Sequence, residues 1–149
     1  MACANPISTD GPAGPIFVRC KQCLPCRIYK QSSLTLRCLL ENQSSSSGQF
    51  ITLTYAQAPE VGSYGDFQKF LKRLRQWNVR KGNSDPLRYL ACGEYGSKSG
   101  RFHYHALVWN GLVPTQEDWD TQLWGNGFVY IGTVTPASVR YTARCTLKF

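Results

Sequence analysis

Two histidines, His103 and His105, lie two residues apart in the run FHYHALVWN, and the chain has no others. Alternate side chains of a β-strand project from the same face, so both imidazoles would point to one side. Two imidazoles placed in this way can chelate a single cation. Two unrelated polar residues on an open sheet face are the plain alternative. A pair that holds every histidine of the chain favours a metal site.

A third metal ligand can come from the strand that precedes the histidines. The runs LRYLACGEY (87–95) and RFHYHALVWN (101–110) flank the turn GSKSGR and predict an antiparallel hairpin. Hairpin pairing can bring Glu94 beside the two imidazoles. Two histidines and one carboxylate leave open positions for a substrate oxygen and water. Such a set suits Mg²⁺ or Mn²⁺ when the ligand on offer is a phosphate.

The last segment, ASVRYTARCTLKF, supplies a candidate nucleophile. On a helix, Tyr141, Arg144, Cys145 and Lys148 fall within about 60° of one another. A tyrosine near a bound metal and cations can attack phosphorus, and the cations stabilise charge on the phosphate oxygens. Tyrosine alone is weak evidence, because the chain has eight.

The chain has seven cysteines, and in a chain without a leader this odd number favours free thiols or metal ligands over a disulfide framework. The run Cys20-x-x-Cys23-x-x-Cys26 is dense in thiols, and Cys3 can join it if the Pro/Gly-rich arm folds back. Four thiolates predict a structural Zn²⁺ site. Cys38 as the fourth ligand, or simple incidental cysteines, are the alternatives. Cys92 is expected in the core.

The formal charge of +8, with 13% aromatic residues, favours a nucleic-acid partner over a merely soluble basic domain. We expect single-stranded DNA to be held by Arg88, Tyr95, Lys98, Arg101, Trp109 and Trp124. The basic side of the segment FQKFLKRLRQWNV is expected to be only a solvated face. No apolar run is long enough to span a bilayer and no secretory signal pattern opens the chain, so a cytoplasmic protein without a membrane partner is expected.

The length of 149 residues predicts one domain, divided into an N-terminal Cys-rich arm and helix (1–45) and a catalytic core (46–149). Residues 1–19 are expected to be irregular. A helix should follow from about Cys26 to residue 43, with an apolar stripe. We assign that stripe to Ile28, Leu36, Leu39 and Leu40.

The remaining elements alternate between strands and helices. We expect strands at 49–56, 87–95, 101–110 and 128–134. Asp66 and Thr115 are expected to cap two intervening helices, and Pro136 to open the last one. The order β-α-β-β-α-β-α predicts an α+β fold of the ferredoxin or RNA-recognition type, with an antiparallel sheet and helices on one face.

These segments together resemble the HUH endonucleases that start rolling-circle replication. Within that family the chain is similar to the replication initiators of the small single-stranded DNA phages, the Microviridae, and especially to their gokushovirus group. The combination of ITLTY, GEYG and HYHA is specific, and the matching pieces cover most of residues 20–148 in family order. The pieces are CKQCLPCR, FITLTY, FQKFLKRLR, RYLACGEYG, FHYHALVWNG and YTARCTLK.

The resemblance implies metal-dependent, strand-specific nicking and joining of single-stranded DNA at a replication origin. In this family tyrosine becomes linked to the 5′-phosphate and a free 3′-OH primes synthesis. It also implies action in the cytoplasm of a bacterial host, with host replication proteins as candidate partners. His103 and His105 match the HUH motif, and Glu94 matches its preceding acidic ligand. In the motif Y-x-x-x-Y-x-x-K, Tyr141 matches the nucleophile, Arg144 the basic position and Lys148 the lysine.

One position departs from the family pattern, because Cys145 stands where the motif has its second tyrosine. A thiol is a poor substitute for attack on a phosphodiester, so Tyr141 is the expected nucleophile. If the second position were the essential one, the chain would be an inactivated variant. Two other readings stay open: a transposase-like or relaxase-like HUH nuclease, and a non-catalytic single-strand-binding module of the RNA-recognition type.

Overall fold

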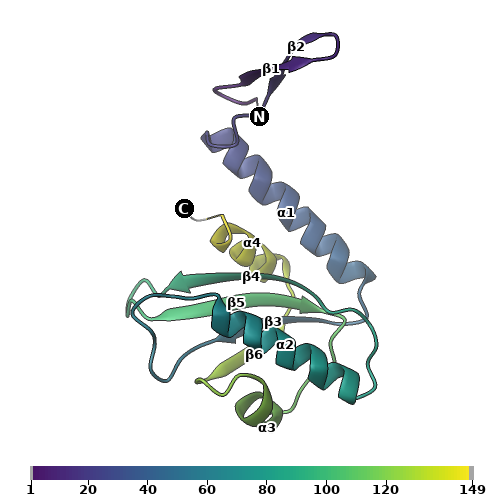
Figure 1. The fold of residues 1–149 in the computed structure, drawn as a ribbon, viewed down its shortest axis with the longest axis vertical. Coiled ribbons are helices and arrows are strands. Elements are labelled where there is room, and N and C mark those ends of the chain that lie inside the picture. The colour runs from purple at the N-terminus through teal and green to yellow at the C-terminus, as the bar shows by residue number, and fades with distance from the viewer. Residues whose placement is uncertain (1, 148–149) are drawn as a thin grey trace.

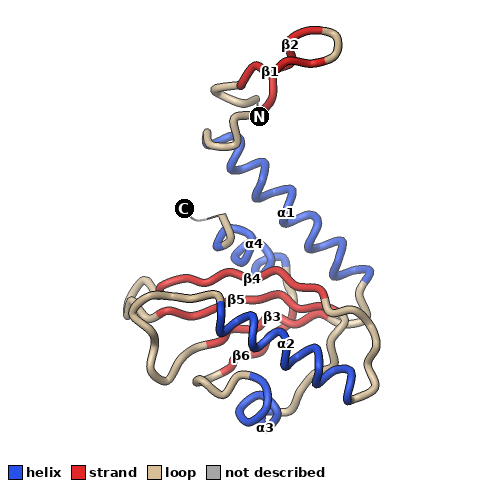
Figure 2. Tube along the Cα trace, viewed as in Figure 1, coloured by secondary structure: helices blue, strands red, loops and turns tan. Residues whose placement is uncertain are grey.

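The computed structural model describes residues 2–147, and its centre is a four-stranded antiparallel sheet (Figures 1 and 2). The strands are β3 (Gly48–Leu53), β4 (Arg88–Tyr95), β5 (Phe102–Trp109) and β6 (Val129–Thr133), in the order β4-β5-β3-β6. All four lie where the alternating sequence patterns predict strands. The prediction of an α+β fold built on an antiparallel sheet is therefore confirmed.

Helices pack on both faces of this sheet. On one face lie α2 (Gly65–Arg80) and α3 (Gln116–Asp118), which continues as the π-helical turn η1 (Trp119–Leu123). The other face is contacted by α4 (Pro136–Cys145) and by the C-terminal half of α1 (Leu24–Ser44). This second helical layer goes beyond the sequence prediction, which placed helices on a single face. Among the helices of the described residues, none has both the length and the apolarity that crossing a bilayer requires.

The alternation of β5 divides its side chains between two packed layers. Phe102, Tyr104, Ala106 and Val108 face α2, where they join a core rich in buried aromatic rings. The other set includes Leu107 and Trp109, which pack with Cys38 of α1 and Val139 of α4. His103 and His105 belong to this second set, so they lie on the face that α4 contacts.

The apolar stripe predicted for α1 is wrong for three of its four residues. Ile28, Leu36 and Leu40 are exposed, while Cys38 is buried and Leu39 is partly buried. The physical reason is visible in Figure 1, where α1 leaves the sheet at an angle and carries its N-terminal half away from the core. Only the face that carries Leu34 and Cys38 reaches the second layer.

The N-terminal arm is not irregular, as expected, but forms a two-stranded hairpin at the outer end of α1 (Figure 1). Its strands are β1 (Ile7–Gly11) and β2 (Gly14–Val18), and Gly14 has a φ of 117°, which suits a residue without a Cβ. Short strands with several prolines and glycines carry little periodic signal, so the sequence pattern alone reads as a loop.

The helix starts follow the sequence prediction in two cases out of three. Thr115 forms a capping box with Asp118, and Pro136 occupies the first turn of α4 behind the capping residue Thr135. Asp66, in contrast, lies inside the first turn of α2, and its carboxylate accepts a hydrogen bond from the Tyr55 hydroxyl at 2.9 Å. The prediction that Asp66 caps the helix is therefore wrong.

The ring of Phe102 occupies space that two glycines leave open. A Cβ added to Gly93 of β4 would clash with this ring, and so would one added to Gly62 in the loop before α2. The Gly62 amide also donates a hydrogen bond of 2.7 Å to the Tyr95 hydroxyl. The two glycines thus let the loop and β4 close tightly over Phe102.

A disulfide bond joins Cys92 of β4 to Cys145 near the end of α4. The sequence prediction that the cysteines are free or metal-bound is wrong for this pair. Cys92 lies on the sheet face that α4 contacts, and the two Cα atoms are 5.9 Å apart, within the usual range for a disulfide. The bond ties the last helix to an outer strand of the sheet.

We expect the Cys92–Cys145 disulfide to contribute about 2–4 kcal/mol to the free energy of unfolding, because it closes a long loop. Urea unfolding of Cys145→Ser should show this loss relative to the oxidised parent. Reductant should produce the same loss in the parent and leave Cys145→Ser unchanged. Alkylation in denaturant should modify five cysteines before reduction and seven after it. Seven modified cysteines before reduction would contradict the bond.

Candidate functional site

The strand register places the predicted site residues directly opposite one another. Glu94 of β4 is paired with His103 of β5, and Cys92 is paired with His105. On the other side of β5, Thr52 of β3 is paired with His105. All five side chains therefore lie on the sheet face that α4 contacts.

Glu94, His103 and His105 form a group that could hold a metal ion. One ligand atom from each residue can be chosen so that all lie within 4.8 Å of one another. His103 Nδ1 lies 3.1 Å from the carbonyl oxygen of Arg101. Since a carbonyl only accepts, this nitrogen carries the proton, and Nε2 keeps its lone pair for a metal.

His105 is fixed in orientation by contacts on both sides of its ring. Its Nδ1 is hydrogen-bonded to Thr52 Oγ1 at 3.0 Å, and the Phe50 ring stacks on it with a centroid distance of 5.7 Å. The edge of His103 approaches at 4.8 Å between centroids. His105 is only 8% exposed, so its position depends on these neighbours rather than on solvent.

Tyr141 of α4 points its hydroxyl into this group. The hydroxyl donates a hydrogen bond of 3.0 Å to Glu94 Oε2, and the ring contacts His105 edge-on at 5.0 Å between centroids. Burial, and then the Glu94 carboxylate, raise the pKa of Tyr141 above its ordinary value, whereas the charge of Arg144 acts in the opposite direction. The side chain is still 38% exposed, so a substrate can reach it.

The other predicted residues of the last helix have different positions. Arg144 is exposed one turn beyond Tyr141. Cys145 is 5% exposed and bonded to Cys92, so its sulfur is not available as a nucleophile. Lys148 lies outside the described residues. The structure thus brings Tyr141, and not the position of the second tyrosine, to the candidate metal ligands.

Two of the residues expected to stack on DNA are buried, and that prediction is wrong for them. Trp109 is 3% exposed and its indole N–H donates to the Asn42 side chain. Trp124 is 2% exposed and donates to the carbonyl of Thr54. Each indole has packed its ring faces in the core, where no base can stack on them.

The four other predicted DNA contacts do not gather at the site. Tyr95 lies on the opposite sheet face, against Phe102. Arg101 donates to the carbonyls of Tyr55 and Ala56 beside the histidines. Arg88 is at the far end of β4, where it pairs with Glu41 at 3.0 Å. Lys98 is exposed in the turn between β4 and β5.

Two exposed aromatic residues that the sequence analysis missed lie beside the histidines. Phe128 is 71% exposed and Tyr130 is 64% exposed. They border a groove of about 440 Å³ that His103 and Arg101 also line. The alternation around the buried Val129 is the signal that could have identified them, because one strand face then carries both rings.

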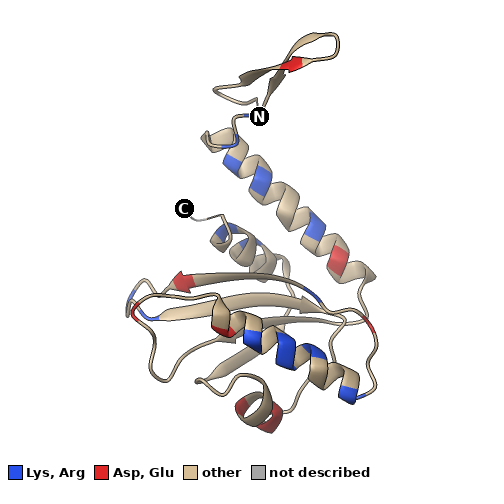
Figure 3. Ribbon diagram, viewed as in Figure 1, with Lys and Arg blue, Asp and Glu red and all other residues tan. Residues whose placement is uncertain are grey.

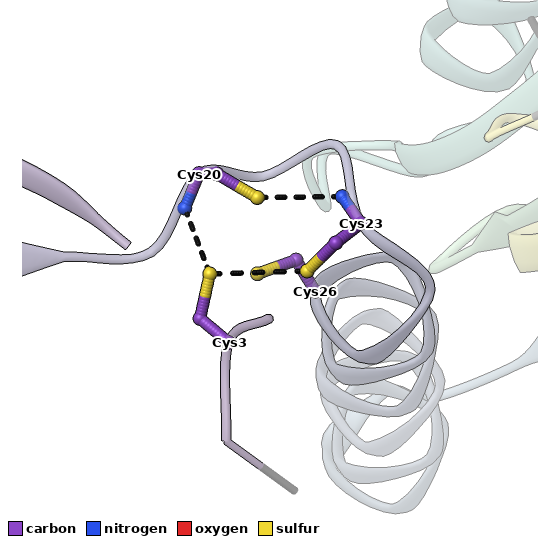
Figure 4. Close-up of side chains that lie close together, drawn as sticks. All are labelled: Cys3, Cys20, Cys23 and Cys26. Atoms are coloured by element: carbon purple, nitrogen blue, oxygen red, sulfur yellow. Dashed lines mark hydrogen bonds between the residues drawn. The ribbon is translucent and has the colours of Figure 1, made fainter. Parts of the chain in front are cut away.

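The cysteine cluster lies at the junction of the N-terminal hairpin and α1. Cys3, Cys20, Cys23 and Cys26 place their sulfurs within 4.8 Å of one another (Figure 4), so the four could hold a metal ion. The amide of Cys20 donates to Cys3 Sγ at 3.3 Å, and that of Cys23 donates to Cys20 Sγ at 3.4 Å. Lys21, with a φ of 65°, turns the chain between them.

The thiols of this cluster differ in acidity. Hydrogen bonds from the backbone, chiefly from Ala4, lower the pKa of Cys23 to about 6. A backbone hydrogen bond from Cys20 also lowers the pKa of Cys3. Burial raises the pKa of Cys26 to about 11. Backbone amides therefore already stabilise thiolates at two of the four positions, and thiolate is the form that binds metals.

Comparison with known proteins identifies relatives over most of the chain. Residues 48–149 match a family of replication-associated proteins of the ORF2 type. Replication-associated protein VP4 of Bdellovibrio phage phiMH2K is 31% identical over 87% of this chain and 47% of its own length. Replication-associated protein ORF2 of Spiroplasma virus 4 is 32% identical over 88% and 48%. The predicted relationship to phage replication proteins is confirmed, and the chain spans about half the length of these relatives.

One solved structure shares the fold. It is the hypothetical protein ORF119 from Sulfolobus islandicus rod-shaped virus 1, with a TM-score of 0.52 and 17% identity. The match covers 74% of this chain and 92% of that one. At this identity the similarity concerns the fold alone.

The Thr52 hydroxyl holds His105 Nδ1, so we expect Thr52→Val to weaken Mn²⁺ binding about tenfold, as loss of a partner of a metal ligand commonly does. Thr54→Val is the matched control, since Thr54 donates to the Phe128 carbonyl and does not touch a histidine. Calorimetric titration with Mn²⁺ measures both. Equal affinities for the parent and Thr52→Val would contradict the role of this hydrogen bond.

Proposed function

Because the chain belongs to the family of replication-associated proteins of the ORF2 type, we propose that it starts DNA replication by cutting one strand at the site on its sheet. The reaction is metal-dependent nicking and rejoining of single-stranded DNA, with Tyr141 as the nucleophile. Glu94, His103 and His105 are the proposed ligands of Mg²⁺ or Mn²⁺.

A single observation carries this proposal, namely the approach of the Tyr141 hydroxyl to the carboxylate of the proposed ligand set. The hydroxyl lies 3.0 Å from Glu94 Oε2, and its ring touches His105. A module that only binds single strands has no need of a tyrosine held against a carboxylate and two histidines. A nuclease that works by covalent catalysis needs such an arrangement.

The proposed reaction exchanges one phosphorus–oxygen bond for another. Glu94 accepts the proton of the Tyr141 hydroxyl, whose oxygen then attacks the scissile phosphorus. The bond from phosphorus to the 3′-oxygen breaks, and that oxygen leaves as a free 3′-OH after taking a proton from water. A divalent cation, when bound, withdraws charge from the phosphate oxygens. The exposed guanidinium of Arg144 is placed to offset charge near Tyr141.

The groove beside His103 is the proposed path of the DNA strand. Phe128 and Tyr130 offer exposed ring faces on which bases can stack, which is how proteins hold single strands without reading much sequence. Arg101 lines the same groove and adds positive charge for the phosphates. The strand would then cross the sheet from β6 towards the histidines of β5.

We expect a covalent protein–DNA adduct when the protein is incubated with a single-stranded oligonucleotide library and Mn²⁺. Tyr141→Phe should abolish the adduct, because phenylalanine has no nucleophilic oxygen. His105→Ala should slow its formation about a hundredfold or more, since a ligand is lost. A denaturing gel with labelled DNA measures both effects.

Tyr130→Phe is the matched control in this experiment, because Tyr130 is an exposed tyrosine beside the same groove. It should form the adduct at nearly the parental rate. An adduct from Tyr141→Phe would assign the nucleophile to another residue. If single-strand binding is intact but no variant forms an adduct, the chain is a binding module or an inactivated relative.

The cysteine cluster is proposed to hold a structural Zn²⁺. Four sulfurs with mutual distances within 4.8 Å suit the tetrahedral coordination that zinc prefers. The hairpin β1–β2 has only exposed or half-exposed residues, so it lacks a core of its own. A metal at its base would supply folding free energy that packing does not.

We expect one zinc per chain by elemental analysis of the parent protein. Cys20→Ser should lose most of this zinc, because the tetrahedral set then lacks one thiolate. Cys38→Ser is the control, since Cys38 is a buried free thiol of α1 outside the cluster, and it should retain the metal. Equal zinc content in Cys20→Ser and Cys38→Ser would contradict the assignment.

A further inference from the structure

A second positively charged surface lies on α1, away from the histidines. Residues 19–40 contain five basic residues and no acidic one: Arg19, Lys21, Arg27, Lys30 and Arg37. Figure 3 shows Lys and Arg spaced along α1, with the first acidic residue near its C-terminal end. This segment therefore holds a large share of the excess positive charge of the chain.

Part of this charge borders a groove along α1. The groove has a volume of about 440 Å³, and its cationic residues are Arg19, Lys21, Lys30 and Arg37. Lys30 and Arg37 are seven residues apart, so they project from one helix face about 10 Å from each other. Both are exposed and have no hydrogen bond or ion pair within residues 2–147. No acidic side chain lines this groove.

The groove continues to an edge of the sheet. Leu34 and Arg37 also line a neighbouring cavity of about 340 Å³ between α1 and β4. The acidic side chain there, Glu41, is neutralised by Arg88, whose guanidinium lies 3.0 Å from its carboxylate. β4 is an outer strand of the sheet, and it carries Glu94 at its other end.

Aromatic rings accompany the cations. Tyr29 is 57% exposed, lines the groove and has the Arg19 guanidinium 4.3 Å above its ring. Tyr89 is 38% exposed and lines the neighbouring cavity. Cations that follow a groove, together with rings on which bases can stack, are the features that hold single-stranded nucleic acid.

We infer that the α1 groove is a second DNA-binding surface, which holds the single strand that flanks the cut. This inference rests on the proposed function for the identity of the substrate. Arg88 and Glu94 are six residues apart on β4, so the groove begins about 20 Å from the site. Its contribution therefore appears only with DNA long enough to reach from the site to α1.

The test compares the double variant Lys30→Gln/Arg37→Gln with the control Lys69→Gln/Lys72→Gln. The control removes the same charge from exposed positions of α2, on the other face of the sheet. Fluorescence anisotropy measures affinity for a short oligonucleotide that covers only the histidine site and for one several times longer. Thermal melting verifies that both variants are folded.

For the long oligonucleotide, the α1 variant should lose affinity about tenfold, and the slope of log K against log salt should fall by about 1.4, or 0.7 for each lost phosphate contact. Affinity for the short oligonucleotide should not change. The control should bind both like the parent. Equal binding of the long strand by the α1 variant and the parent would overturn the inference, and so would a loss seen only with duplex DNA.

Failure of the proposed function remains distinguishable from failure of this inference. Tyr141→Phe removes adduct formation and should keep the full difference between the long and short strands, because α1 is unchanged. If the parent forms no adduct, the affinity and salt measurements still report on the groove. If the parent forms an adduct but both double variants bind the long strand equally, only the second surface is refuted.

Discussion

The pairing register of β4 with β5 is the constraint on which the candidate site depends. It sets Glu94 opposite His103 and Cys92 opposite His105, both on the face that α4 contacts. A shift of one residue would turn Glu94 and Cys92 to the opposite face, towards the core around α2. The ligand set, the contact to Tyr141 and the disulfide would then all be lost together. One hairpin thus determines three separate features of the molecule.

The sequence was sufficient to predict the sheet, because alternating patterns and turn residues mark each strand, and the hairpin follows from the short turn between β4 and β5. It also identified His103, His105, Glu94 and Tyr141, which the structure brings together. It could not predict the disulfide, because that bond depends on how α4 settles on the sheet. Trp109 and Trp124 were misassigned for a similar reason, since composition does not tell a stacking ring from a core ring.

The last helix is held by contacts of different kinds along its length. Val139 packs in the second layer, the Tyr141 hydroxyl donates to Glu94, and Cys145 is bonded to Cys92. The same helix packs against α1, which carries the cysteine cluster at its other end. A change in the arm therefore has a direct physical connection to the helix that holds the proposed nucleophile.

The close fit of Phe102 against Gly62 and Gly93 has a consequence for how the gene can vary. Any side chain at either glycine would meet the ring, so neither position can drift to alanine without moving β4. A smaller residue at position 102 would relieve that clash but leave a void in the core beside Tyr104. Substitutions at these three positions are therefore tolerated only in combination. Sequence divergence should be slow here, even though none of the three residues takes part in the proposed chemistry.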